Sequence, residues 1–190
     1  PKRTWQVPLC VRYGDGAELH KQCVLLKKQT ARLELETKTC PAFVMPNADG
    51  GGYYRFALED NGWQSLLANF GRLNEREALS AADSLSAAYL ANRLSTEALL
   101  AAIRTIAQSP YPRVVLAPEP ILERLRDDLA PPESRARLRQ FMREIYRPRL
   151  DAIERAAVVL GDDHVLRHVD ETTRQVARVG RLERRIRQAL

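Results

Sequence analysis

The sequence predicts an α+β chain, in which an antiparallel β-sandwich is followed by an all-α array of antiparallel helix pairs. Apolar residues recur with a period of two up to about residue 60 and with a helical period from residue 62 onward. The 190 residues, 45% of them hydrophobic, suffice for one sizeable core or two small ones. We therefore expect a β-sandwich domain over residues 1–60 and a helical domain over residues 61–190.

The N-terminal part contains runs in which apolar and polar residues alternate, as they do in half-buried strands. Gly, Asp and Asn residues separate these runs. Five strands are few for a sandwich, so the sequence leaves open that others are missing upstream. The predicted strands are residues 5–13, 22–28, 31–36, 42–45 and 53–58.

The helical part carries recognisable start signals. Asn74 followed three residues later by Glu77 has the pattern of a capping box and predicts a helix to about Ala91. Ser95 is expected to begin the next helix.

Proline and aspartate mark the later helices. Proline pairs precede the stretches ILERLRDDL and ESRARLRQFMREIY, and Pro148 is expected to begin another helix, ending near Leu160. Asp170 is expected to begin a final amphipathic run. The helices show no fixed repeat length, so a consensus solenoid is not supported.

The segment PNADGGGYYRF, residues 46–56, has three glycines that suggest a phosphate-binding loop. Such a loop opens a helix and is usually completed by a Lys-Ser/Thr pair. Here the glycines are followed by the strand-like residues 53–58, so the sequence argues against a nucleotide site.

Three cysteines lie in the first quarter of the chain, so at least one thiol is free or paired outside it. If a hairpin forms around GDGAELHK, Cys10 and Cys23 come nearly opposite one another, close enough for a disulfide. The alternative is that the cysteines are buried free thiols. A disulfide would favour a periplasmic or secreted location over the cytoplasm. The third cysteine is Cys40.

Composition limits the partners. No run of about 18 uncharged apolar residues is present, so we expect no membrane-spanning segment. The net charge of +6, from 30 basic and 24 acidic residues, permits nucleic acid binding without indicating it. Arginines cluster in residues 174–187, but an apolar stripe and two glutamates accompany them, which favours a packed helix with a basic outer face. We expect no nucleic acid partner.

The strongest metal candidate is HVLRHVDE, where His164 and His168 stand four residues apart, as in a zinc-binding helix. Position 165 is Val, so the glutamate that would act as general base is missing. His20 is expected in a solvated loop. Adjacent carboxylates such as Asp127 and Asp128 are expected to lie on solvent-exposed faces of helices. We therefore predict no catalytic, cofactor-binding or metal-binding residue in this chain.

The order of motifs resembles the C-terminal half of aminopeptidase N-like zinc metallopeptidases, which include the endoplasmic reticulum aminopeptidases. The resemblance lies in WQVPL, CVLLKK, CPAFVMPNADGGGYYRFAL, the Trp63 helix and LNEREALSAADSLSAAYLANRLSTEALLAAI. It covers residues 5–107 well and 140–155 loosely. Asn92 departs from it, because family members often carry glycine there.

The resemblance implies that the chain is a non-catalytic portion of a zinc aminopeptidase. The family's zinc helix, its downstream glutamate ligand and its peptide-anchoring strand belong to an upstream domain, so no hydrolysis is expected from this chain alone. The sandwich would brace the catalytic domain of the parent, and the helices would cover it and shape the access of peptide substrates. The alternative is a free-standing helical module that binds a protein or peptide.

Overall fold

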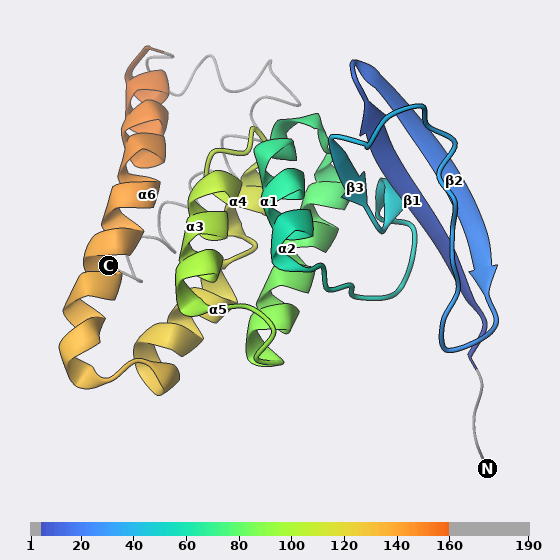
Figure 1. The fold of residues 1–190 in the computed structure, drawn as a ribbon. Coiled ribbons are helices and arrows are strands. Elements are labelled where there is room, and N and C mark those ends of the chain that lie inside the picture. The colour runs from blue at the N-terminus through green and yellow to red at the C-terminus, as the bar shows by residue number, and fades with distance from the viewer. Residues whose placement is uncertain (1–4, 160–190) are drawn as a thin grey trace. The chain divides into compact units, whose positions relative to one another are not determined.

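The computed structural model describes residues 5–159 of the chain (Figure 1). Two compact units, Pro1–Ser109 and Pro110–Leu190, make up the chain. The first unit contains both the sheet and the helices that cover it. The domain boundary predicted at residue 60 marks the point where the spacing of apolar residues changes from strand-like to helical, and it stays a prediction.

The first unit contains a three-stranded antiparallel sheet of β1 (Val7–Asp15), β2 (Glu18–Leu26) and β3 (Phe43–Met45), in the order β2-β1-β3. Asp15 pairs with Glu18, so two residues make the turn, and Gly16 adopts the positive φ of 57° that glycine tolerates. The hairpin therefore extends further than predicted, and the expected loop GDGAELHK belongs largely to the strands.

A disulfide joins Cys10 of β1 to Cys23 of β2, which are direct cross-strand partners. The sequence left this disulfide open against free thiols, and the longer hairpin places the two cysteines directly opposite one another. Cys40 is free and exposed.

Two of the predicted strands are wrong. Residues 31–36 form no ladder, because the side chain of Gln22 takes the place of a neighbouring strand: its amide accepts from Glu36 N at 2.8 Å and donates to Glu34 O at 3.3 Å. Residues 53–58 run beside a helix, where Phe56 N donates to the Ser84 hydroxyl at 3.3 Å. Both segments keep the alternation of half-buried and exposed side chains without a strand partner.

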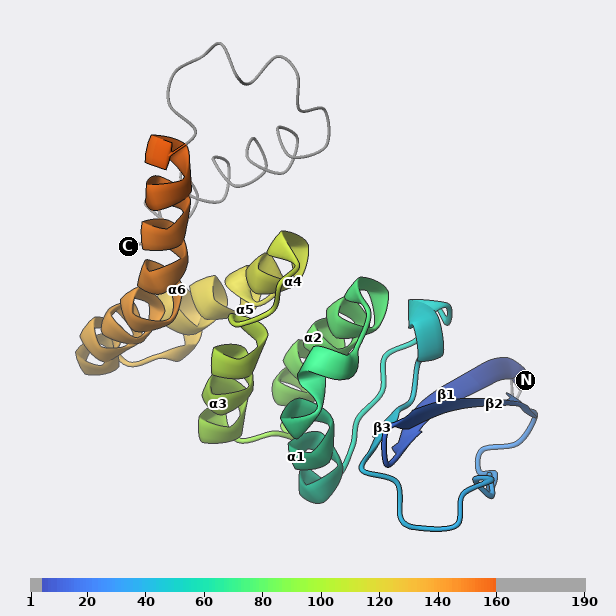
Figure 2. The same cartoon turned by 90° about the horizontal axis from the view of Figure 1, so that it is seen from above.

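The predicted sandwich is not confirmed, since within residues 5–159 helices cover the sheet where a second sheet was expected. α1 (Asp60–Ala68) packs against β3, and α2 (Glu75–Leu90) packs against α3 (Thr96–Ile106). α1 and α2 lie between the sheet and α3 (Figure 2). Short 3₁₀ turns, η1 (Ala48–Gly50) and η2 (Phe70–Arg72), complete the unit. Its fully buried side chains include Tyr13, Phe43, Met45, Leu66, Leu85, Leu99 and Ile103.

The predicted helix starts in this unit are confirmed. The Asn74 side chain accepts from Glu77 N at 3.0 Å, while the Glu77 carboxylate accepts from Asn74 N at 3.1 Å, which makes a complete capping box. The Ser95 hydroxyl accepts from Ala98 N at 3.1 Å and caps α3.

α2 ends in a Schellman motif centred on Asn92. Asn92 N donates to Tyr89 O and Arg93 N donates to Ala88 O, both at 2.9 Å, while Asn92 has a φ of 57°. Asparagine is among the few residues other than glycine that adopt this conformation readily. The departure at Asn92 therefore leaves the turn intact.

The second unit contains α4 (Pro112–Leu116), α5 (Glu119–Arg124), a π-helical turn η3 (Leu125–Leu129) and α6 (Pro132–Val159). The Tyr146 hydroxyl donates to Val115 O at 3.3 Å, and burial raises the pKa of Tyr146. The core of the unit includes Val114, Ile121, Leu122, Leu125, Phe141, Met142 and Ile145.

The helix start predicted at Pro148 is wrong, because Pro148 lies inside α6. Proline removes one backbone donor and strains the interior of a helix, so the rest of the helix must be held in place. Here the preceding turns are anchored by four buried residues, Phe141, Met142, Ile145 and Tyr146. The predicted pairing of antiparallel helices is not established by the described contacts.

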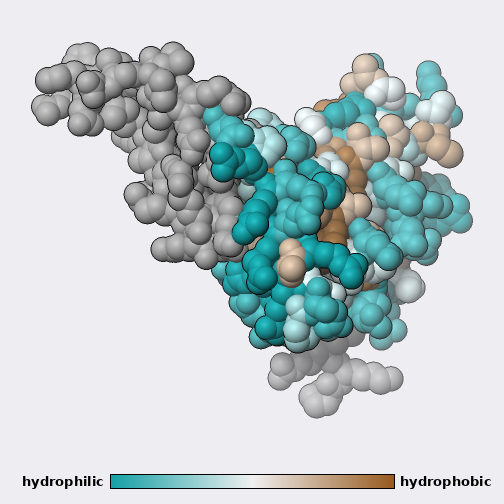
Figure 3. Space-filling model, turned by 90° about the vertical axis from the view of Figure 1, so that its left-hand side faces the viewer, coloured by the Kyte–Doolittle hydropathy of each residue, from teal (hydrophilic) through white to brown (hydrophobic). Residues whose placement is uncertain are grey.

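Hydrophilic side chains cover most of the described surface on the face drawn in Figure 3, where a narrow hydrophobic strip is also visible. Across residues 5–159, none of the helices combines the length and apolar character needed to cross a membrane.

We expect the disulfide to stabilise the hairpin substantially. Replacing both Cys10 and Cys23 with serine should lower the free energy of unfolding by about 3 kcal/mol, because the cross-link closes a short loop in the unfolded chain. Urea denaturation under oxidising conditions measures this, with Cys40→Ser as a control that should leave the midpoint unchanged. Equal midpoints for the double variant and the wild type would contradict the expectation.

The Schellman turn gives a second test. Asn92→Ala should lower the free energy of unfolding by about 1 kcal/mol, because a Cβ without a compensating polar group is strained at positive φ. Asn92→Gly should change it by less than about 0.5 kcal/mol, since glycine adopts this φ freely. Urea denaturation of the two variants side by side would disprove the argument if they proved equally stable.

Candidate functional site

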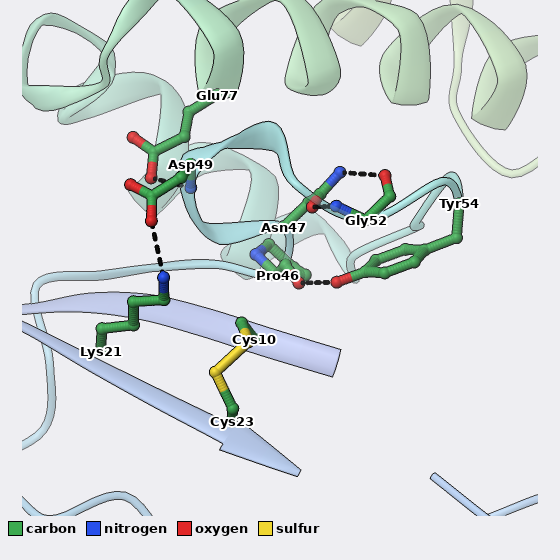
Figure 4. Close-up of a disulfide and its surroundings, with 9 residues drawn as sticks. All are labelled: Cys10, Lys21, Cys23, Pro46, Asn47, Asp49, Gly52, Tyr54 and Glu77. Carbon is green, nitrogen blue, oxygen red and sulfur yellow. Dashed lines mark hydrogen bonds and ion pairs between the residues drawn. A yellow bond between two sulfur atoms is a disulfide. The ribbon is translucent and has the colours of Figure 1, made fainter. Parts of the chain in front are cut away.

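The segment of residues 46–56 leads from β3 toward α1 and passes along α2, so it lies between the sheet and the helices (Figures 1 and 4). Its backbone contacts the side chain of Glu77, in the first turn of α2, through Asp49. Figure 4 shows the Glu77 carboxylate beside the backbone of Asp49.

Glu77 is fully buried, with 0% of its side chain exposed, and its carboxylate accepts four hydrogen bonds. Arg12 of β1 donates through Nε at 2.7 Å and also through Nη2. Asp49 N donates at 2.9 Å and Asn74 N at 3.1 Å. A buried charge is tolerated when it is paired and its remaining oxygen sites are satisfied, and both conditions hold here.

Arg12 makes a further bond, from Nη2 to Arg72 O at 2.9 Å. Its guanidinium thus reaches α2 and the turn that precedes it, while only 13% of its side chain is exposed. We call the contacts of Arg12, Asp49 and Asn74 with Glu77 the carboxylate lock, because they join the sheet, the loop and the helix at one group.

The glycines of the loop use their own amides for the loop's internal bonds. Gly50 N donates to Asn47 O at 3.0 Å, and Gly51 N donates to Ala48 O at 3.3 Å. Gly52 N donates to the Asn47 side chain at 2.8 Å. A phosphate cradle needs amides that are free to meet the anion, so this geometry agrees with the argument against a nucleotide site.

Asn47 and Gly50 fix the path of the loop. The Asn47 amide, only 3% exposed, donates to Gly52 O at 3.0 Å and to the Ser80 hydroxyl of α2 at 2.9 Å. Gly50 has a φ of 58°, and a Cβ there would lie 2.8 Å from the backbone oxygen of Arg76. A larger residue would therefore separate the loop from α2.

The residues after the glycines alternate between the interior and solvent. The Tyr54 hydroxyl donates to Pro46 O at 2.8 Å, and burial raises the pKa of Tyr54 (Figure 4). Phe56 stacks on Trp63 with ring centroids 5.5 Å apart. Arg55 forms a bidentate but exposed ion pair with Asp83, and Tyr53 is wholly exposed.

A cleft of about 880 Å³ lies between this segment and α2. Its wall combines the exposed Tyr53 with the guanidinium groups of Arg55 and Arg76. Beyond it, Lys21 of β2 holds Asp49 by an ion pair of 2.7 Å, and that hydrogen bond lowers the pKa of Asp49. The surroundings of the loop are therefore polar and open.

The residues considered from the sequence lie elsewhere. His164 and His168, and the arginines of residues 174–187, fall outside the described residues. His20 is not in a loop as expected but in β2, where it stacks on Tyr13 and lies 3.5 Å from the Glu18 carboxylate. Asp127 pairs with Arg126 at 2.7 Å.

Zinc is the metal that the resemblance implies for the parent enzyme. Among residues 5–159, no group of three or more His, Cys, Asp or Glu side chains could hold a metal ion. The donor set that zinc needs is therefore not offered by the described part of the chain.

The carboxylate lock was missed in the sequence. Glu77 was identified only as a capping residue, and Arg12 only as a polar position of a strand. Their separation of 65 positions leaves no local signal of their contact. A polar residue flanked by apolar ones in a strand next to a capping glutamate is at most a weak hint.

We expect the carboxylate lock to be strongly coupled. Arg12→Gln and Glu77→Gln should each lower the free energy of unfolding by about 3 kcal/mol, because each leaves the other charge buried without its partner. The double variant should cost less than the sum of the two. Urea denaturation of all four proteins measures the coupling, and strict additivity would contradict it.

A matched control is the exposed pair Arg55 and Asp83, whose side chains are 64% and 57% exposed. The same cycle with Arg55→Gln and Asp83→Asn should show little coupling, because water screens an exposed ion pair.

Comparison with known proteins identifies most of the chain. The family model described as ERAP1-like C-terminal domain matches residues 43–181. A search of curated proteins gives no match. The matched residues include 108–135, where the resemblance seen in the sequence was lost, as well as the loop and α2. The chain therefore belongs to the ERAP1-like C-terminal domain family, a non-catalytic region of aminopeptidase N-like enzymes.

Proposed function

We propose that this chain braces and partly covers the catalytic domain of a zinc aminopeptidase and shapes the access of peptides to it. The observation that carries the proposal is the family match over residues 43–181. Zinc would be held by the catalytic domain, since the described part of this chain lacks a suitable donor set.

The carboxylate lock supports a bracing role. A support must hold its parts in fixed relative positions, and in the first unit the sheet, loop and helix meet at the buried Glu77. The disulfide between Cys10 and Cys23 adds a covalent restraint on the hairpin. The first unit therefore has the means to transmit a position from its sheet to its helices.

A role in peptide access is consistent with the charge of the chain. Its excess of six basic residues would favour the approach of peptides that carry carboxylates. A cover that excludes water and orients the peptide raises the rate without adding a catalytic group.

The disulfide also supports an oxidising location for the protein. Disulfides persist in secreted proteins, in the endoplasmic reticulum and in the periplasm, and they are rare in the cytosol. We propose a periplasmic or secreted site of action on this ground.

The proposal can be tested with the reading frame that encodes this chain. We expect the full protein to bind about one zinc per chain, as a single catalytic site requires, and to cleave aminoacyl fluorogenic substrates. The 190-residue chain alone should do neither. Deleting the chain from the full protein should change how kcat/KM depends on peptide length, because the cover is then lost.

Two outcomes would refute the proposal. One is stoichiometric zinc and peptidase activity in the 190-residue chain by itself. The other is a deletion variant that stays folded, keeps its zinc and shows the same dependence on peptide length as the full protein. Zinc content by mass spectrometry and circular dichroism distinguish a true lack of effect from a failure to fold.

A further inference from the structure

A second cavity, of about 600 Å³, lies in the first unit between α1, the connection from α2 to α3, and α3 itself. Its floor is apolar and deeply buried: Trp63 is 3% exposed, Leu85 1% and Leu94 7%. Sites for small molecules are typically about 300–1,000 Å³ and combine such a floor with a few polar groups. The cavity is distinct from the cleft beside the glycine loop.

The wall of this cavity contains a buried donor without a partner. The indole Nε1 of Trp63 makes no hydrogen bond in the described part of the chain, although Trp63 is almost wholly buried. A buried tryptophan N–H usually finds an acceptor, and leaving it unpaired costs free energy. An acceptor atom supplied by a ligand would remove this cost.

The rim carries one acidic and one basic side chain. Asp60 is the first residue of α1, and Arg93 follows the Schellman turn at the end of α2. The backbone N–H of Arg93 is held by Ala88 O, which fixes the point from which its side chain leaves. In the described structure these two charges are not joined to each other, and neither takes part in an ion pair elsewhere.

The N-terminus of α3 adds to the positive side of the rim. Ser95 lines the cavity, and its hydroxyl accepts from Ala98 N. The other backbone N–H groups in the first turn of a helix have no partner within the helix, and together they carry a partial positive charge. The rim thus offers a carboxylate on α1 and positive groups at the start of α3.

We propose that this cavity binds a small zwitterion with an apolar side chain, namely an apolar amino acid or dipeptide. The ammonium group pairs with Asp60, the carboxylate pairs with Arg93, and the side chain lies on the apolar floor where a carbonyl or carboxylate oxygen accepts from Trp63. A simple anion would meet Asp60 and a simple cation would meet Arg93, so a ligand with both charges fits best. This site does not depend on the proposed function.

Binding can be measured by isothermal titration calorimetry on the 190-residue chain. The probes are L-leucine and leucyl-leucine, with three analogues that each lack one feature: leucinamide has no carboxylate, N-acetylleucine has no ammonium, and glycine has no side chain. We expect saturable binding of at least one of the two zwitterions at or below about 1 mM. Each analogue should bind at least about tenfold more weakly, because one charged or apolar contact is lost.

Variants test the residues. Arg93→Gln and Asp60→Asn should each weaken binding about tenfold, and Trp63→Phe should weaken it while keeping the aromatic floor. Lys27→Gln and Glu36→Gln remove matched exposed charges that do not line the cavity, and they should leave affinity unchanged. Urea midpoints confirm that each variant is folded, and Ala98→Phe, which fills the cavity, should abolish binding.

The proposal is overturned if neither zwitterion binds at concentrations up to about 10 mM, or if binding is insensitive to both Arg93→Gln and Asp60→Asn in folded protein. It is also overturned if N-acetylleucine or leucinamide binds as tightly as the zwitterion, because one charge would then suffice. None of these results depends on peptidase activity, so a failure of this proposal would leave the proposed function untested and unchanged.

Discussion

The buried carboxylate of Glu77 is the group on which the first unit depends. It is the meeting point of a strand, a loop and a helix, none of which is adjacent to another in sequence. Such a group is stable only when all of its partners are in place, because an unpaired buried charge costs several kcal/mol. The sheet is small, with β3 only three residues long, so a specific polar anchor helps to set its position against α2.

Local chemistry made part of this fold predictable. The capping box at Asn74 and the cap at Ser95 are set by residues close in sequence, and both were confirmed. Between a disulfide and free thiols, which the sequence left open for Cys10 and Cys23, the structure has the disulfide. The strands expected at 31–36 and 53–58 failed for one reason. Alternation reports which side chains face inward, and a strand also needs a neighbour to complete its ladder. Here Gln22 and helix α2 take the neighbour's place.

The candidate sites were less predictable, because they depend on contacts between distant residues. Arg12 and Glu77 are 65 positions apart, and nothing in either surrounding sequence indicates the other. The cavity that Trp63 lines is formed by α1, the α2–α3 connection and α3, so it exists only once these have packed. The resemblance to aminopeptidase N-like enzymes implied a glycine at position 92, where this chain has Asn. The turn at that position is what places Arg93 at the rim.

Helix α2 connects these features, since each of its ends has a separate task. Its N-terminal turns carry Glu77 and the wall of the glycine-loop cleft, while its C-terminal part supplies Leu85 and the turn that precedes Arg93. Sixteen residues extend roughly 24 Å, so the two ends do not touch, and both depend on the helix remaining formed. The capping box and the Schellman turn close the helix at its two ends, which protects the backbone where fraying would otherwise begin. Stabilisation of α2 by the carboxylate lock therefore also preserves the cavity at the far end, without any contact between the two.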